Sequence, residues 1–171
     1  MKCLSKVMLS ACSLFVAAPA FAQDSAAEST SGSATILRAV SMERSSDLAF
    51  GRIVRPSSGS STVAINADTG VRSVDGNGVL LSGSYSRAAY SVEGEGGQTV
   101  SLSLSALELT GPAESDPIAV TLVKSADTQV LSGSAGGDGA ATFHVGGSFA
   151  VSNTTATGAY SGTFTATVAY Q

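Results

Sequence analysis

The chain has 171 residues, of which nine are basic and 13 acidic, and its formal net charge is −4. Lys2 and Lys6 lie in an N-terminal segment that we expect to be removed, which leaves seven basic against 13 acidic side chains. This acidic balance argues against a basic nucleic-acid interface and against a polybasic membrane patch.

Residues 1–22 have the pattern of a cleavable secretory signal peptide. Lys2 and Lys6 give a positive start, residues 7–18 are apolar or small, and Ala20-Phe21-Ala22 is a small-x-small cleavage site. The apolar run is shorter than the ~20 residues of a membrane-spanning helix. We predict a mature chain that begins at Gln23, has no transmembrane segment, and is exported to the periplasm, cell surface or medium.

An alternative reading of the same segment is a lipoprotein signal. Leu9-Ser10-Ala11-Cys12 fits a lipobox, but only Val7 to Ala11 separates Lys6 from Cys12. This run is shorter than the ~7 to 15 residues of an ordinary apolar core, so lipid anchoring at Cys12 is disfavoured. Cys3 and Cys12 are the only cysteines, so the predicted mature chain contains no disulfide.

Residues 23–33 contain no large apolar side chain, and we predict a flexible polar leader there. From residue 34 to residue 171, short alternating apolar runs are separated by turn residues, which indicates a single all-β domain with almost no helix. The clearest predicted strands are 99–106, 118–123, 143–151 and 160–170. Weaker ones are 35–40, 48–54, 62–66, 79–81 and 88–93.

The turn at Asp75-Gly76-Asn77-Gly78 has two interpretations. It resembles part of a calcium loop, but the further oxygen ligands and the closing Glu are missing. We favour a tight hairpin turn in which Asn77-Gly78 takes the positive φ angles.

Two groups are candidates for catalytic residues. Glu93 and Glu95 share one face of a strand, yet the surrounding glycines favour a solvated turn over an acid–base pair. His144 is out of phase with Phe143 and Val145 and is expected to face solvent, and no nucleophile elbow accompanies it. We therefore predict a protein that is not an enzyme, and we expect no metal site and no cofactor.

Three segments carry a family resemblance: Ala34-Thr35-Ile36, the run from Asp47 to Ile53 (DLAFGRI), and the ending from Gly158 to Tyr170 (GAYSGTFTATVAY). Together they resemble the bacterial family known as domain of unknown function 4402, over about residues 34–171. That family is similar to the pilin-like and spore-coat-U-like proteins of the chaperone–usher pathway. The resemblance implies an immunoglobulin-like, pilin-like antiparallel β-sandwich.

The resemblance also implies a site. Pilins of that pathway have a Gly fourteen positions from the C-terminus and a penultimate aromatic residue, and Gly158 and Tyr170 occupy those places. By resemblance, a periplasmic chaperone, and later neighbouring subunits, would add a strand beside the last strand and contact Tyr160, Phe164, Val168 and Tyr170. Ile36, Leu37 and Val40 belong to a segment that would be donated to a neighbour or would close the chain's own fold.

Two functions remain open at this point. The first is an exported structural or adhesive surface protein, such as a pilus- or fimbria-like subunit assembled by strand addition. The second is a self-contained secreted or periplasmic binding module for a glycan or surface polymer.

Overall fold

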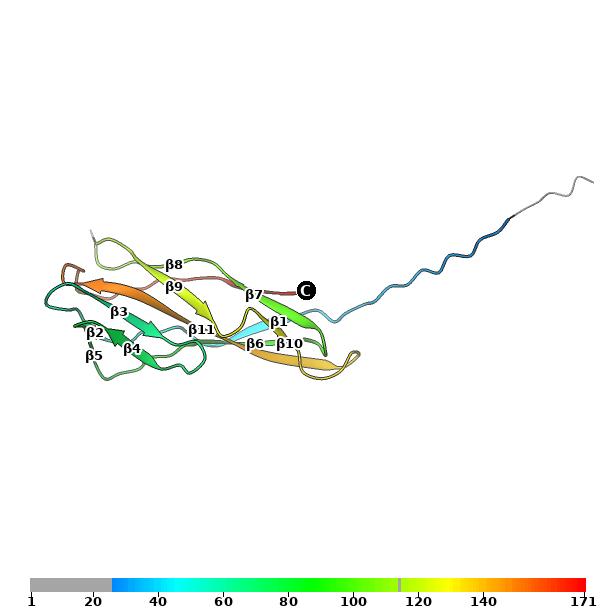
Figure 1. Ribbon diagram of the computed structural model, residues 1–171, viewed down its shortest axis with the longest axis horizontal. Helices are drawn as coiled ribbons and strands as arrows, with labels where there is room; N and C mark the ends of the chain where they lie inside the picture. Colours follow the sequence, from blue (N-terminus) through cyan, green and yellow to red (C-terminus); the bar gives the residue numbers. More distant parts are fainter. Residues whose placement is uncertain (1–25, 114) are drawn as a thin grey trace, which may run out of the picture. The chain divides into compact units, whose positions relative to one another are not determined.

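The computed structural model describes residues 26–113 and 115–171, and the predicted signal peptide lies outside these residues (Figure 1). The chain divides into two units, Met1–Thr35 and Ile36–Gln171. Of the first unit, residues 26–35 are exposed and have neither helix nor strand. Within the described residues no helix is long and apolar enough to cross a bilayer.

The second unit is built from antiparallel β-sheets, which confirms the predicted all-β class, and its described residues form no helix. The largest sheet has seven strands in the order β1-β6-β11-β3-β4, with β9 on β11 and β8 on β9. These strands are β1 (Ser41–Ser46), β3 (Ser60–Ile65), β4 (Arg72–Asp75), β6 (Ala88–Glu95), β8 (Leu107–Leu109), β9 (Ile118–Lys124) and β11 (Asp138–Ser152).

A second sheet has three strands in the order β10-β7-β12. They are β7 (Thr99–Leu104), β10 (Thr128–Val130) and β12 (Ala166–Tyr170). A separate two-stranded ribbon joins β2 (Ile53–Val54) to β5 (Val79–Leu80).

The core lies between the seven-stranded and three-stranded sheets, as in a β-sandwich. One cluster packs Val92, Phe143 and Val145 of the large sheet against Val100 and Leu102 of the small one. A second cluster packs residues near the other end of β11; it consists of Phe50, Val63, Ile65, Leu107, Val120, Phe149 and Val151. The alternation in the sequence therefore placed the buried faces correctly in the strongest strands.

Strand β11 changes partner at Gly146 and Gly147. Residues Asp138–Val145 pair with β6, whereas Gly147–Ser152 pair with β3. A β-carbon on Gly146 would overlap the carbonyl oxygen of Ile65, so only glycine lets β3 approach there. One long strand can thus carry both core clusters.

Several local predictions were wrong. Residues 35–40 form no strand: the first strand begins at Ser41 and is held by pairing with β6, although its own apolar alternation is weak. The Asp75–Gly78 segment is no hairpin, because β4 pairs with β3 and β5 pairs with β2. Its positive φ falls on Gly76, at 93°.

Candidate functional site

The C-terminal strand β12 is paired on one edge only. It runs antiparallel to β7, with Ala166 opposite Leu104 and Tyr170 opposite Val100, and it ends the three-stranded order. The Ser105 N–H donates to the Thr165 carbonyl, and the Gln171 N–H donates to the Thr99 carbonyl, at 2.9 and 3.0 Å.

These two bonds show which backbone groups of the strand face β7. Backbone groups alternate between the two edges of a strand, so odd-numbered residues bond to β7. The N–H and C=O groups of Ala166, Val168 and Tyr170 therefore point to the other edge. No strand pairs with that edge in the part of the chain that the structure describes.

The inward side chains of this strand, and that of Phe164 just before it, are only half-buried. Phe164, Ala166, Val168 and Tyr170 alternate with exposed residues, as the sequence predicted, and they pack against the first core cluster. Val40 and Met42, which lie before and within β1, are also half-buried on that cluster. The central residues of the same cluster, by contrast, are buried.

The edge also lacks the usual protection against pairing. Edge strands are commonly blunted by charged residues, Pro or a bulge. From Gly158 to Gln171 the chain has no charged side chain and no Pro. The register of β12 on β7 is regular over its five residues.

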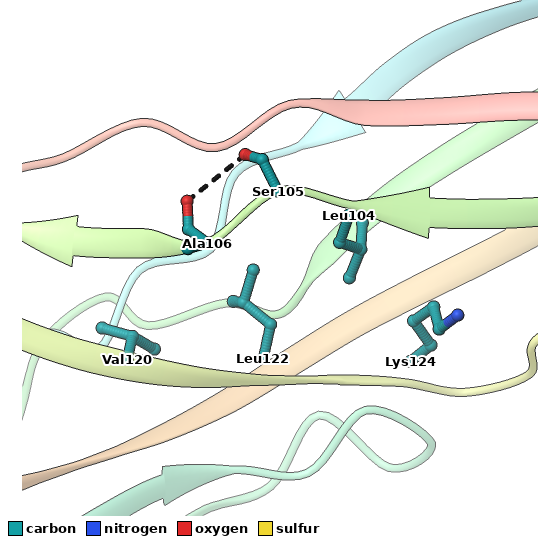
Figure 2. A pocket seen from close by; sticks show the side chains of 6 residues that line it. All are labelled: Leu104, Ser105, Ala106, Val120, Leu122 and Lys124. Atoms are coloured by element: carbon teal, nitrogen blue, oxygen red, sulfur yellow. Dashed lines mark hydrogen bonds between the residues drawn. The ribbon is translucent and has the colours of Figure 1, made fainter.

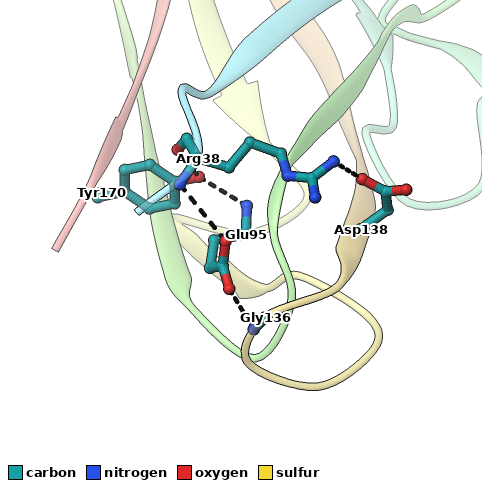
Figure 3. A network of polar contacts seen from close by, with 5 residues as sticks. All are labelled: Arg38, Glu95, Gly136, Asp138 and Tyr170. Carbon is teal, nitrogen blue, oxygen red and sulfur yellow. Dashed lines mark hydrogen bonds and ion pairs between the residues drawn. The ribbon is translucent and has the colours of Figure 1, made fainter. Parts of the chain in front are cut away.

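At the C-terminal end of β12, the hydroxyl group of Tyr170 bonds to two other segments of the chain. The hydroxyl accepts a hydrogen bond from the Glu95 N–H at 2.7 Å and donates one to the Arg38 carbonyl at 2.9 Å (Figure 3). A β-carbon on Gly94 would overlap the same hydroxyl. Tyr170 thus joins the small sheet both to β6 of the large sheet and to the segment before β1.

Glu95 is the second member of this network, and the sequence did not reveal its role. The residue is only 8% exposed, so the expected solvated turn is wrong. Its carboxylate accepts hydrogen bonds from the Gly136 N–H and, at 3.4 Å, from the Arg38 N–H. Glu93, on the same face of β6, is exposed, so the two carboxylates do not share a buried site.

Arg38 completes the network with an ion pair to Asp138 (Figure 3). The two side chains are 51% and 86% exposed, so solvent screens this pair and it contributes little to stability. The hydrogen bonds of Tyr170 and Glu95, which lie deeper, fix the geometry instead.

Gly158 and Tyr160 lie apart from the unpaired edge of β12, which we call the free edge. A β-carbon on Gly158 would overlap the ring of Pro112, and the Tyr160 ring lies against Gly111. The Tyr160 hydroxyl donates to the Ala156 carbonyl at 3.0 Å. The structure therefore brings Phe164, Val168 and Tyr170 together and separates them from these two residues.

The expected donor or closing segment is divided. Ile36 is 93% exposed and Leu37 is 38% exposed, whereas Val40 packs on the first core cluster. Their strand-addition role, like that of the C-terminal residues, stays a prediction.

A second opening lies between Leu104–Ala106 and β9. The chain leaves β7 of the three-stranded sheet there and joins the seven-stranded sheet as β8, beside a gap of about 310 Å³. Figure 2 shows Leu104 from one side and Val120 and Leu122 from the other pointing into this space. Lys124 bridges it by donating to the Leu102 carbonyl at 2.8 Å and pairing with Asp127.

His144 faces outward but is half-buried rather than solvated. Burial lowers the pKa of its imidazole, and the Arg87 guanidinium lowers it further, while Asp68 opposes them. Ser125 Oγ accepts from the backbone N–H of His144, not from the ring, so this serine and histidine do not form a nucleophile–base pair. Among the described residues, no group of three or more acidic, His or Cys side chains is placed to hold a metal ion.

The comparisons with known proteins give one family. The family described as "Domain of unknown function (DUF4402)" matches residues 40–170. The chain belongs to this family. No curated protein and no solved structure matches it.

The first and last residues of the DUF4402 match both lie on the first core cluster. The match begins at Val40 and ends at Tyr170, and both side chains pack on the same core cluster. The DUF4402 domain of this chain therefore includes β1, β12 and all strands between them.

Proposed function

We propose that this protein is an exported, non-enzymatic structural or adhesive surface protein whose C-terminal strand is extended by a strand from a partner. A partner strand beside β12 would bond to the outward backbone groups of Ala166, Val168 and Tyr170. It would also cover the half-buried side chains of Phe164 and Val168. The uncharged free edge of β12 carries this proposal.

The same free edge of β12 indicates which partners the protein would have. During export a periplasmic chaperone would supply the strand, and in an appendage a neighbouring subunit would replace it. The segment with Ile36, Leu37 and Val40 is the candidate donor, because Ile36 is 93% exposed and Leu37 is 38% exposed. Assembly would then be head to tail, which gives an open fibre.

A capture experiment tests the proposal. The mature chain is co-expressed with a periplasmic chaperone of a chaperone–usher system, and the complex is recovered through a tag on the chaperone. Ala166→Pro removes one outward N–H at the first residue of an edge strand, where Pro is tolerated. Ala166→Val is the matched control, because it changes the side chain and keeps the N–H.

We expect Ala166→Pro to fold and to be captured at least fivefold less than Ala166→Val. The double variant Phe164→Ser, Tyr170→Ser should lose capture as well, whereas Thr165→Ser, Thr167→Ser on the exposed face should keep it. Equal capture of all four variants would refute strand addition at this end.

A self-contained binding module is the second candidate. The Tyr170 network favours it, since the hydroxyl already ties the last strand to Glu95 and Arg38 within one chain. This module would unfold cooperatively as a monomer and would bind no chaperone. Size-exclusion chromatography and thermal unfolding of the mature chain separate the two candidates.

A further inference from the structure

A cleft of about 450 Å³ lies at the end of β11 opposite to the Tyr170 network, and we call it the tip cleft. Its walls are residues 115–119, at the start of β9, and residues 150–160, which follow from the end of β11. Asp138, at the other end of β11, is fourteen residues from Ser152, so the two sites are about 45 Å apart along the strand. The volume is that of an ordinary small-ligand site.

Tyr160 provides a fixed aromatic wall of the tip cleft. Its ring lies against Gly111, where any β-carbon would overlap it, and its hydroxyl is held by the Ala156 carbonyl. The ring is half-buried and also lines the cleft. An immobilised ring offers a flat apolar surface to a ligand at little cost in side-chain entropy.

The hydroxyl groups of Ser152, Thr154 and Thr155, which belong to the same wall as Tyr160, are also held in place. The Ser152 N–H donates to Thr155 Oγ1 at 2.9 Å, and the Thr154 N–H donates to Ser152 Oγ at 3.2 Å. Arg55 bonds to the Thr155 carbonyl at 2.6 Å and fixes the loop from outside. Ser152 Oγ also bonds to Thr154 Oγ1 at 2.8 Å and to Thr155 Oγ1 at 3.1 Å. Each hydroxyl can both donate and accept, so the capacity that these bonds leave suits a ligand with hydroxyl groups of its own.

Among the described residues that line the cleft, Asp116 is the one that carries a charge. Its side chain is exposed, and within the described residues its carboxylate takes part in no ion pair or hydrogen bond. A carboxylate offers two acceptor oxygens, which match two neighbouring hydroxyl groups. Because no Lys or Arg stands among the described lining residues, Asp116 would repel an anionic ligand.

We propose that the tip cleft binds a neutral saccharide, with the sugar ring on Tyr160 and a pair of its hydroxyl groups on Asp116. The fixed aromatic face fits the apolar face of a sugar ring, and the serine and threonine hydroxyls fit its polar rim. A cationic ligand would use Asp116 and the ring, but a protonated amine offers no acceptor to those hydroxyls. The inference concerns residues outside the free edge of β12, and it does not depend on strand addition.

The test uses the ¹⁵N-labelled mature chain and three kinds of probe. These are neutral gluco-, manno- and galacto-oligosaccharides of six residues, sialyllactose as the acidic probe and spermidine as the cationic probe. We expect a neutral oligosaccharide to shift the amides of residues 115, 116, 118 and 119 and of residues 152–160 in a saturable way. Asp116→Asn and Tyr160→Ala should each weaken this binding at least tenfold, and Tyr160→Phe, which keeps the ring, should keep it.

Asp116→Asn changes an exposed side chain and should not alter folding, so it remains informative if Tyr160→Ala fails to fold. Tyr85→Ala, which removes an exposed aromatic ring outside the cleft, is the control and should bind like the original chain. Saturation by spermidine alone, or unchanged affinity of Asp116→Asn, would overturn the proposal. Ala166→Pro should bind the saccharide normally, which distinguishes a failure of this site from a failure of strand addition.

Discussion

Removing the hydroxyl group of Tyr170 is the smallest change that tests how β12 is held to the rest of the domain. Tyr170→Phe keeps the ring on the core cluster and removes only the oxygen that bonds to the Glu95 N–H and the Arg38 carbonyl. Glu95 is buried, so its N–H would be left without a partner and away from water. Arg38 is exposed, and water can replace the hydroxyl at its carbonyl.

The environments of the Glu95 N–H and of the Arg38 carbonyl determine how much stability Tyr170→Phe loses. An unsatisfied buried N–H costs about 1–3 kcal/mol, whereas losing a hydrogen bond that water can replace costs about 0.5 kcal/mol. We therefore expect the free energy of unfolding to fall by about 2 kcal/mol. For a domain the size of Ile36–Gln171, this lowers the melting temperature by about 6–8 °C.

Thermal unfolding followed by circular dichroism measures the effect, and urea titration gives the free energy. Tyr160→Phe is the matched control: it removes a hydroxyl whose partner, the Ala156 carbonyl, belongs to an exposed residue, and it should cost about 0.5 kcal/mol or less. If the two variants melted within 2 °C of each other, the claim that Tyr170 locks the sheets together would be wrong.

Two further predictions concern the body of the domain. Gly146→Ala should lower stability by about 3 kcal/mol or more, because its β-carbon would meet backbone atoms of residues 65–67 that no rotamer can move, whereas Gly32→Ala, with nothing within 4 Å, should be neutral in the same melting assay. The lowered pKa of His144 predicts a loss of stability as the pH falls below 6.5 toward the folded-state value, since the unfolded chain then binds the extra proton. Urea titrations at pH 7.5 and 5.5 should show a smaller loss for His144→Gln than for the original chain, and equal losses would contradict this.

The strands that the sequence predicted best are those whose alternation reports burial directly. In 99–104 and 143–151 every second side chain enters the core, so the period of two was visible. Strand β1 was missed because, of its six side chains, only Met42 and Ser46 are even half-buried, and pairing with β6 holds it in place. Short strands such as β8 and β10 likewise depend on their partners.

The site was partly predictable for a similar reason. The alternation of Phe164, Val168 and Tyr170 identified an inward face, and the structure places all three on one cluster. Glu95 and Arg38 are remote in sequence from Tyr170 and have no local pattern, so only the folded chain brings them together. Tyr160 shares the parity of the strand but lies before it, where the chain turns past Gly111.

The central claim is that β12 is bonded on one edge and open on the other. Amide hydrogen exchange of the isolated mature chain, resolved residue by residue by NMR, tests it most directly. The account predicts slow exchange at Thr167 and Ala169, whose N–H groups face β7, and fast exchange at Ala166 and Val168, whose N–H groups face outward. Equally slow exchange of all four amides in the monomer would contradict it, because that result requires a strand already paired on both edges.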